Sequence, residues 1–299
     1  MKILQNARNE RSKGAKFSRI LITLQSKFSE FDNIVIVEGA SDVALFNIVY
    51  YRKDIFYCSA ECGKSEISNF LSVIRDKIVL GERELFAIAD ADFDHLSGKK
   101  YNNIILTDHH DGEMMILNNH NEFLKTFITE HTKTEYFYNL ILDEAAKELH
   151  QEIISAGYKI GILKYINLIN DYNMNFKGYT GNQHFIFNDF NITLDIYSYI
   201  DDIIKRSDRV DNKYRDEIIL EYEKEIKKEH NYFQIVNGHD YCNILARVYS
   251  EKLFLNKKNI TKEHVESKLR TFYNYNFFKK TNVYKNIKGK KKQLTANNS

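Results

Sequence analysis

The chain has 299 residues, 43% hydrophobic and 28% charged, which is enough to bury the core of one large or two ordinary domains. It contains no proline, and its three cysteines, Cys58, Cys62 and Cys242, lack the paired spacing of a zinc site or a disulfide framework. No apolar run has the length of a signal peptide or a membrane span. We therefore expect a cytoplasmic protein without membrane contact.

The charge is distributed unevenly along the chain. The formal charge is +2, but residues 1–20 and 281–299 carry +5 each, so residues 21–280 carry −8. We expect a basic N-terminal helix over 1–30 and a basic tail over 281–299. Basic ends around an acidic body favour nucleic-acid contact, because lysine and arginine neutralise phosphates. A solubilising terminus has the same composition, so the tail alone decides nothing.

The first half alternates strand-like and helix-like stretches. Helical apolar spacing covers 17–30, and a second helix follows a cap at Ser41 or Asp42. A third helix begins near Lys64. Short apolar runs between these segments predict strands at 33–37, 54–58, 85–89 and 103–107. This order predicts an α/β domain over 31–120, built on a parallel sheet.

The second half changes to long helical patterns, so we expect a mainly helical C-terminal domain over 121–280. Helical segments are predicted at 121–129, 134–156, 159–170, 194–207, 212–229, 240–254 and 261–272. Two aromatic stretches, 172–181 and 184–192, suggest a small hairpin. Aromatic residues concentrated at 272–278 suggest either an exposed interface, for a homodimer or a partner protein, or packing into the helical domain.

Two predicted strands end in carboxylates. Glu38 follows the strand at 33–37, and Asp90, Asp92 and Asp94 follow the strand at 85–89. Parallel strands bring their carboxyl ends to one edge of a sheet, where ligands bind. Carboxylate oxygens suit hard cations, so the sequence predicts a Mg²⁺ site, with Mn²⁺ as a substitute. A solvated acidic loop is the alternative, while EF-hand spacing is excluded because its glycine and final glutamate are missing.

Further candidates lie around these acids. Asp111 and Glu113 follow the strand at 103–107 and are additional metal ligands or simply helix-start residues. Lys64 opens a helix and is a candidate catalytic contact to a substrate phosphate. The adjacent His109 and His110 are poor Mg²⁺ ligands and are interpreted as loop positions. The candidate substrate-binding residues are Lys99, Lys100, His239 and Asp240.

These motifs resemble a known family. Val37-Glu38-Gly39 followed by Asp90-Ala91-Asp92 resembles the Toprim fold of topoisomerases, bacterial primases and OLD-family nucleases, over roughly residues 30–120. Ser41-Asp42, Thr107-Asp108-x-x-Asp111-x-Glu113 and Asn237-Gly238-His239-Asp240 are similar to a bacterial Toprim family encoded beside an AAA/ABC-type ATPase, the effector nucleases of PARIS anti-phage systems. The resemblance implies release from the ATPase partner, cleavage of host tRNA and growth arrest. Separately, we expect a homodimer when the protein is active.

The chemistry of the motifs assigns provisional roles. Asp90 and Asp92 would hold one Mg²⁺, and Glu38 would bind a second ion or act as general base. Asp94, Asp111 or Glu113 would complete the ligand set. Two other hypotheses remain open: a housekeeping Toprim nuclease of RNA maturation or DNA repair, and a non-catalytic subunit of an ATPase complex whose acids are structural.

Overall fold

The computed structural model contains two compact units. The first comprises Met1–Ala91, Lys99–Asp108 and Tyr273–Ser299, and the second comprises Asp92–Gly98 and His109–Phe272. The end of the chain thus returns to the first unit, which differs from the consecutive domains that composition suggests. The structure describes residues 18, 20–27, 30–77, 80, 83–134, 141–188, 190–208, 210, 212–250 and 260–297, with side chains of the last stretch described to 290.

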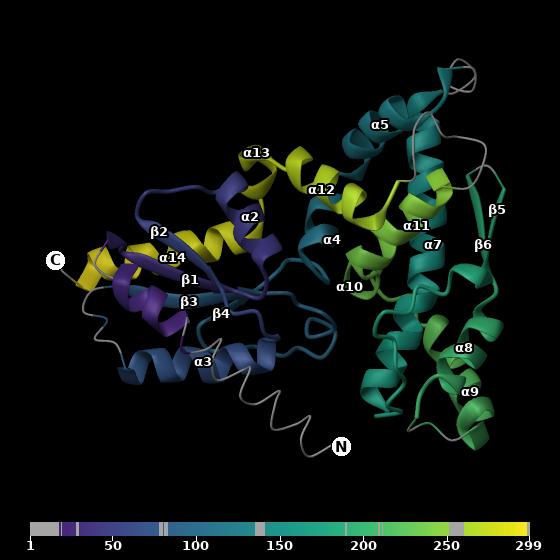
Figure 1. Ribbon diagram of the computed structural model, residues 1–299, viewed down its shortest axis with the longest axis horizontal. Coiled ribbons are helices and arrows are strands. Elements are labelled where there is room, and N and C mark those ends of the chain that lie inside the picture. Colours follow the sequence, from purple (N-terminus) through teal and green to yellow (C-terminus); the bar gives the residue numbers. More distant parts are fainter. Residues whose placement is uncertain are drawn as a thin grey trace. The chain divides into compact units, whose positions relative to one another are not determined.

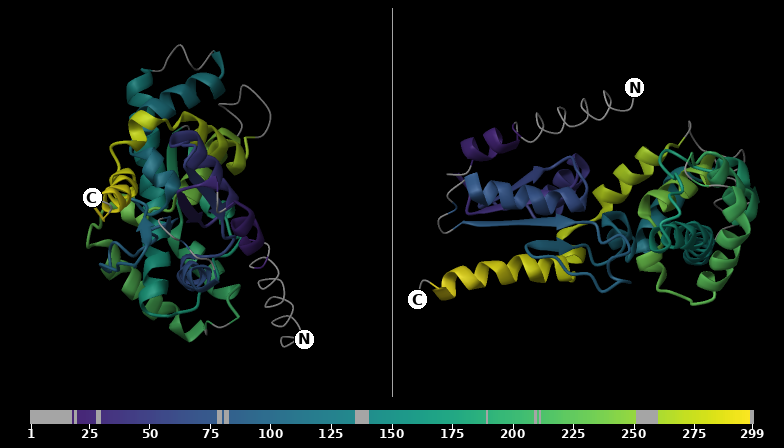
Figure 2. Two further views of the ribbon diagram at one scale, coloured as in Figure 1. Left: turned by 90° about the vertical axis from the view of Figure 1, so that its left-hand side faces the viewer. Right: turned by 90° about the horizontal axis from the view of Figure 1, so that it is seen from below.

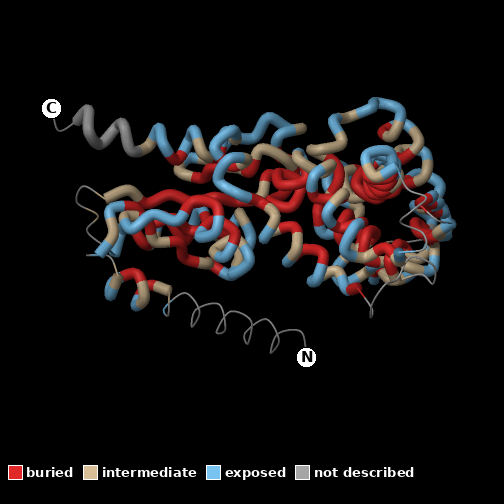
Figure 3. The backbone as a smooth tube through the Cα atoms, turned by 90° about the horizontal axis from the view of Figure 1, so that it is seen from above, coloured by how far each residue is buried: buried red, intermediate tan, exposed pale blue. Residues whose placement is uncertain are grey.

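The first unit is built on a four-stranded sheet in the order β2-β1-β3-β4 (Figure 1). Its strands are β1 (Asn33–Val37), β2 (Ile55–Ser59), β3 (Glu84–Ala89) and β4 (Ile104–Leu106). All three pairings are parallel. Every residue of β1 is buried, as expected for a parallel strand covered on both faces (Figure 3). The predicted α/β class is confirmed, and each strand lies within one residue of its predicted position.

Helix α3 (Lys64–Lys77) covers one face of this sheet. Alternate side chains of β1 and β3 point toward it, because successive residues of a strand face opposite sides. Leu21 and Leu24, from the helical residues 20–27, join the same core. The sheet and α3 contribute Ile34, Ile36, Leu85, Ala87, Ala89, Ile67, Phe70, Leu71 and Ile74.

The other face is covered by α2 (Ala40–Val49), α13 (Tyr275–Phe278) and α14 (Asn282–Asn297), and Figure 1 shows α2 and α3 on opposite sides of the strands. Phe278 is fully buried, with its ring centroid 6.0 Å from that of Phe46 and 5.7 Å from that of Tyr50. Tyr273 is also buried. The aromatic cluster is therefore largely a core of the first unit. The predicted exposed interface is wrong for these two residues, and so is packing into the helical domain.

The predicted basic tail is also corrected, because residues 282–297 form helix α14. Val283 and Ile287 of this helix are buried, four residues apart on one face. Lys290 lies with its Nζ 5.5 Å from the ring centroid of Phe86 in β3. Two apolar anchors and one cation–π contact thus hold α14 along the sheet (Figure 2), a pattern that the lysine-rich composition obscures. The basic residues before Ser18 lie outside the described residues.

The second unit is mainly helical, as predicted. None of the helices among the described residues is long and apolar enough to cross a membrane. Its helices are α4 (Gly112–Leu117), α5 (His120–His131), α7 (Leu142–Ile169), α8 (Ile196–Lys205), α9 (Arg215–Ile226), α10 (Tyr232–Ile235), α11 (Gly238–Ser250) and α12 (Lys262–Phe272).

Helix α7 is the central element of this unit, and it corrects the prediction of separate helices at 134–156 and 159–170. The helix runs without a break through Gly157 and Gly161. A Cβ at Gly161 would collide with the carbonyl oxygen of Ile235, and a Cβ at Gly157 would lie 3.0 Å from Val236. These glycines therefore mark a close approach of α10 rather than a helix end.

The predicted hairpin exists but is displaced along the chain. Strands β5 (Phe185–Asn188) and β6 (Asn191–Leu194) form an antiparallel pair, whereas residues 172–181 form turns and irregular structure. Within that stretch Gly178 and Gly181 have positive φ values of 68° and 60°. Such conformations suit turns better than strands, which explains why aromatic content alone misplaced the first strand.

Candidate functional site

The topology of the first unit selects one edge of its sheet. From β1 the chain passes to β2 on one side, and then to β3 on the other. The strand order therefore reverses between β1 and β3, and ligands of open α/β sheets bind at the carboxyl ends of strands at such a switch point. Glu38 follows β1 and Asp90 follows β3. The sequence-predicted acids of this unit thus stand at the expected edge.

Glu38 and Asp90 are directly connected. The backbone N–H of Asp90 donates to Oε1 of Glu38 at 3.0 Å, and both residues are half-buried. The next turn is fixed by Gly39, whose N–H donates to Oδ2 of Asp42 at 2.8 Å. The N-cap of α2 is therefore Gly39 rather than Ser41 or Asp42, and Asp42 acts from the third helical position. Glycine and aspartate of the motif hold the strand-to-helix turn that carries Glu38.

The turn after β3 is fixed from two further directions. Lys64 Nζ donates to the carbonyl oxygens of Asp90 at 2.8 Å and Ala91 at 3.0 Å. The N–H of Ala91 donates to Oγ1 of the buried Thr107 at 2.9 Å. The structure thus gives Lys64 a positioning role on the backbone, whereas the sequence suggested a phosphate contact.

Asp108, the other residue of the Thr-Asp pair, caps α14. Its carboxylate accepts the backbone N–H groups of Asn282 at 2.7 Å and Val283 at 3.0 Å. A carboxylate at a helix N-terminus satisfies unpaired donors and interacts favourably with the helix dipole. This motif residue therefore has a structural explanation.

The other predicted acids belong to the second unit, whose boundary falls between Ala91 and Asp92. Asp92 is exposed, has a φ of +49°, and donates its N–H to the carbonyl oxygen of His110. Asp94 is buried. His110 is also buried and its Nδ1 lies 3.2 Å from the carbonyl oxygen of Gln234, while burial lowers its pKa. The prediction that His109 and His110 occupy loop positions is confirmed, because neither residue lies in a helix or a strand.

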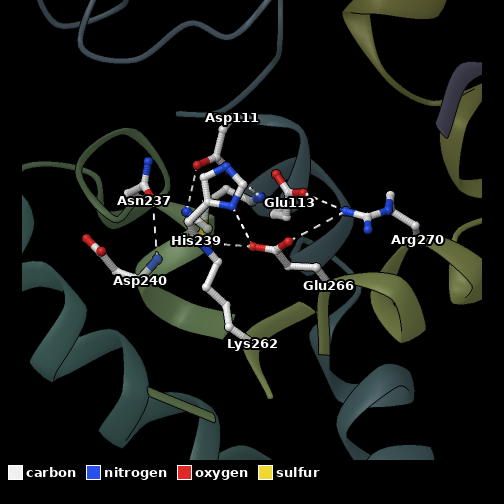
Figure 4. A network of polar contacts seen from close by, with 10 residues as sticks. Asp111, Glu113, Asn237, His239, Asp240, Lys262, Glu266 and Arg270 are labelled. Carbon is white, nitrogen blue, oxygen red and sulfur yellow. Dashed lines mark hydrogen bonds and ion pairs between the residues drawn. The ribbon is translucent and has the colours of Figure 1, made fainter. Parts of the chain in front are cut away.

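Asp111 joins two helix N-termini (Figure 4). Its Oδ1 accepts the N–H of Met114 in α4 at 2.9 Å, and its Oδ2 accepts the N–H of Gly238 in α11 at 2.6 Å. Burial, and then the neighbouring Glu113, raise the pKa of Asp111 to about 7. A Cβ on Gly238 would collide with Glu113 and approach Asp111 Oδ1 to 2.6 Å. Both carboxylate oxygens of Asp111 thus serve a helix junction, which favours its structural role over a metal ligand.

A network of alternating charges extends from this junction (Figure 4). His239 Nδ1 lies 2.7 Å from Oε1 of Glu266, and this hydrogen bond raises the pKa of the half-exposed His239 to about 9. Arg270 Nη1 lies 3.3 Å from Oε1 of Glu113 and 3.9 Å from Oε2 of Glu266. Lys262 Nζ also approaches Glu266, at 3.4 Å. The acids of this cluster are therefore paired with cations from α11 and α12.

Asn237 and Asp240 are the first and last residues of the Asn-Gly-His-Asp motif at 237–240. Asn237 Oδ1 accepts the N–H of Asp240 at 3.2 Å, and Asp240 Oδ2 accepts from Lys164 Nζ at 2.6 Å. The structure thus brings Asp111, Glu113 and the Asn-Gly-His-Asp motif together in the second unit, a grouping that was not predicted from the sequence. Sequence reasoning missed Lys164, Glu266 and Arg270, whose charges at helical spacing look like ordinary solvated positions.

The carboxylate oxygens of Glu38 and Asp90 at the sheet edge are ligands of the type that hard cations bind. Among the described residues, no three His, Cys, Asp or Glu side chains are grouped as a ready metal site. Mg²⁺ usually takes one or two carboxylates and obtains its other ligands from water and substrate phosphates, so a third side chain is not required. Glu38 and Asp90 supply such oxygens, and Asp92 follows Asp90 by two residues along the chain.

No protein-family model matches the chain, and no curated protein sequence matches it.

Proposed function

We propose that the chain is a Mg²⁺-dependent Toprim-type nuclease that cleaves RNA, with tRNA as the favoured substrate. The observation that carries this proposal is the hydrogen bond between the Asp90 N–H and Glu38 at the switch point of a parallel sheet. Glu38 and Asp90 would hold the cation, and Mn²⁺ would substitute for Mg²⁺; the predicted ligand Asp92 belongs to the second unit and is left out of this arrangement. The other predicted ligands, Asp94, Asp111 and Glu113, are not needed for this arrangement.

In this proposal, some residues take part in the reaction and others hold those residues in position. A bound Mg²⁺ would supply charge stabilisation to the phosphate and lower the pKa of a bound water. As the alternative to binding the cation, Glu38 would accept a proton at its carboxylate, whose Oε1 accepts the Asp90 N–H. Lys64 keeps the Asp90–Ala91 backbone in place through two carbonyl contacts. Lys99 and Lys100, in the loop of the first unit, are the proposed phosphate contacts.

The biological setting is proposed from the resemblance. We propose that the chain acts as an anti-phage effector that is held by an AAA/ABC-type ATPase, released on infection, and active as a homodimer that arrests growth. His239 and Asp240 remain candidates for substrate contact, although both side chains take part in ion pairs. A neighbouring ATPase gene would favour this setting over housekeeping RNA maturation or DNA repair.

A substrate panel tests the proposal. Purified protein is incubated with tRNA, other structured RNA, and single- and double-stranded DNA, each with Mg²⁺, with Mn²⁺ and with EDTA. We expect metal-dependent cleavage of RNA, strongest for tRNA. Cleavage of DNA alone would contradict the proposed substrate. Absence of cleavage of every substrate by the chain released from its ATPase would support the non-catalytic hypothesis.

A further inference from the structure

A cavity of about 490 Å³ lies in the second unit, outside the sites described above, and is bounded by α5, α7, α9 and α10. We name it the α7 groove. Its wall on α7 runs from Lys147 to Lys159, with the intervening contacts recurring at intervals of three and four residues. These positions share one face of the helix. With a rise of about 1.5 Å per residue, the twelve-residue interval makes this wall about 18 Å long.

The lysines among the residues that line the groove carry positive charge. Lys147 and Lys159 lie at its two ends, and no aspartate or glutamate among the described residues lines it. Glu152, on the same helix, is turned elsewhere, because its Oε2 accepts the N–H of Ile192 at 2.9 Å. Gln151 and Ser155 add polar groups between the lysines. The groove therefore matches an elongated anionic ligand.

The groove also offers flat rings. His120 stacks on the buried His150, with ring centroids 3.5 Å apart and an interplanar angle of 7°. Burial lowers the pKa of His120, and lowers that of His150 to about 3, so both imidazoles are neutral at physiological pH. Tyr232 of α10 lines the same groove. Neutral rings between separated cations suit stacked bases better than a simple inorganic anion.

We propose that the α7 groove binds a single-stranded segment of nucleic acid. Lys147 and Lys159 contact successive parts of the phosphate backbone, and His120 and Tyr232 stack on bases. This inference extends the proposed nuclease function by assigning a substrate contact to the helical unit, but the binding itself needs neither metal nor cleavage.

The test measures binding of a short fluorescein-labelled single-stranded oligoribonucleotide by anisotropy, in EDTA and over a range of salt concentrations. Lys147→Ala/Lys159→Ala is compared with Lys177→Ala/Lys205→Ala, which removes two exposed lysines of the same unit outside the groove. At about 0.7 per phosphate contact on a single strand, the groove variant should lower the log–log salt slope by about 1.4. The control pair should leave the slope unchanged.

A second pair of variants tests stacking. Tyr232→Phe keeps the ring and should bind as the wild type does. Tyr232→Ala should weaken binding about fivefold or more, the lower limit for loss of one stacked base. Equal affinities of the alanine and phenylalanine variants would contradict stacking at this residue.

Two results would overturn the groove assignment: equal binding by both lysine pairs, or displacement of the oligonucleotide by polyglutamate as effectively as by unlabelled RNA. The latter would indicate an acidic protein partner instead. Lysine-dependent binding by a protein that cleaves nothing would reject the nuclease proposal and retain the groove. Cleavage by a protein whose RNA binding ignores Lys147 and Lys159 would reject the groove alone.

Discussion

Single residues in this chain are often held by the backbone groups of distant segments. Glu38 accepts the N–H of Asp90, Asp108 accepts two N–H groups of α14, and Asp111 accepts one each from α4 and α11. A carboxylate that accepts backbone N–H groups from another segment forms charge-assisted hydrogen bonds with it. These bonds fix the distance between the two segments. Motif acids of this kind therefore have structural consequences apart from any catalytic role.

The first prediction concerns Gly238. Replacing Gly238 with alanine should lower the free energy of unfolding by about 1–3 kcal/mol, because its Cβ would collide with Glu113 and press on Asp111. Gly289→Ala is the matched control, since nothing lies within 4 Å of its Cβ. Urea unfolding followed by circular dichroism measures both. A Gly238→Ala protein as stable as the control would show that the α4–α11 junction is not tightly packed.

The second prediction concerns pH. The pKa of His239 is raised to about 9 from an ordinary value of 6.5, so folding gains from its protonation below pH 6.5. This gain is lost as the pH rises from 6.5 through about 9. The pKa of Asp111 is raised to about 7 from 3.8, so ionisation of the unfolded state also reduces stability between pH 3.8 and 7.

Urea unfolding at several pH values between 6 and 9.5 tests the His239 effect. Wild-type stability should decline over this range, and His239→Gln, which cannot titrate, should show a smaller decline. Parallel plots of the free energy of unfolding against pH for the variant and the wild type would show that the contact with Glu266 does not raise the pKa of His239.

At the scale of elements, helix α14 shows how composition can mislead. Its lysines suggested a basic tail, whereas Val283, Ile287 and the Asp108 cap attach it to the sheet. Two apolar residues four apart form a weak periodic signal within a lysine-rich segment. Its cap comes from a residue more than 170 positions earlier, which no local pattern reveals.

The strands of the first unit were predicted correctly from composition, whereas helix α7 was not. Continuous apolar runs of three to five residues identified the parallel strands correctly, since burial on both faces of a sheet leaves few polar positions. The single helix through Gly157 and Gly161 was divided, because the reason for its glycines is the backbone of α10. The motif residues around Asp111 could be singled out individually from the sequence, but neither their grouping nor their cationic partners on α12 could be predicted, since surface charges have no distinctive spacing.

The third prediction concerns the aromatic core under α13. Phe278→Ala should destabilise the protein by about 3–5 kcal/mol, because this variant lacks a fully buried ring that packs on Phe46 and Tyr50. Ile48→Ala, at a residue that is 52% exposed, should change stability little. Chemical denaturation distinguishes this packing from an interface: an interface residue would affect self-association while leaving monomer stability nearly unchanged.

At the scale of the whole molecule, the proposed nuclease would have to bind its anionic substrate through local cations, because residues 21–280 carry a formal charge of −8. Lys99 and Lys100 are exposed and lie in the first unit, which also contains Glu38 and Asp90. Lys99→Ala/Lys100→Ala should weaken substrate binding and lower the salt slope by about one unit for each phosphate that is no longer neutralised. Turnover at saturating substrate should be preserved. Unchanged affinity and an unchanged slope, measured by anisotropy, would show that this loop is only a connection.

The central claim is that the switch point between β1 and β3 is a metal-dependent phosphodiesterase centre. The most direct measurement compares Mg²⁺-dependent tRNA cleavage by the wild type, Glu38→Gln and Asp76→Asn. The Glu38→Gln side chain would retain an oxygen to accept the Asp90 N–H but would lack the charge and basicity, whereas Asp76 is exposed on α3. We predict a loss of about a hundredfold or more for Glu38→Gln, with Asp76→Asn at the wild-type rate. Near-normal cleavage by folded Glu38→Gln would contradict the account.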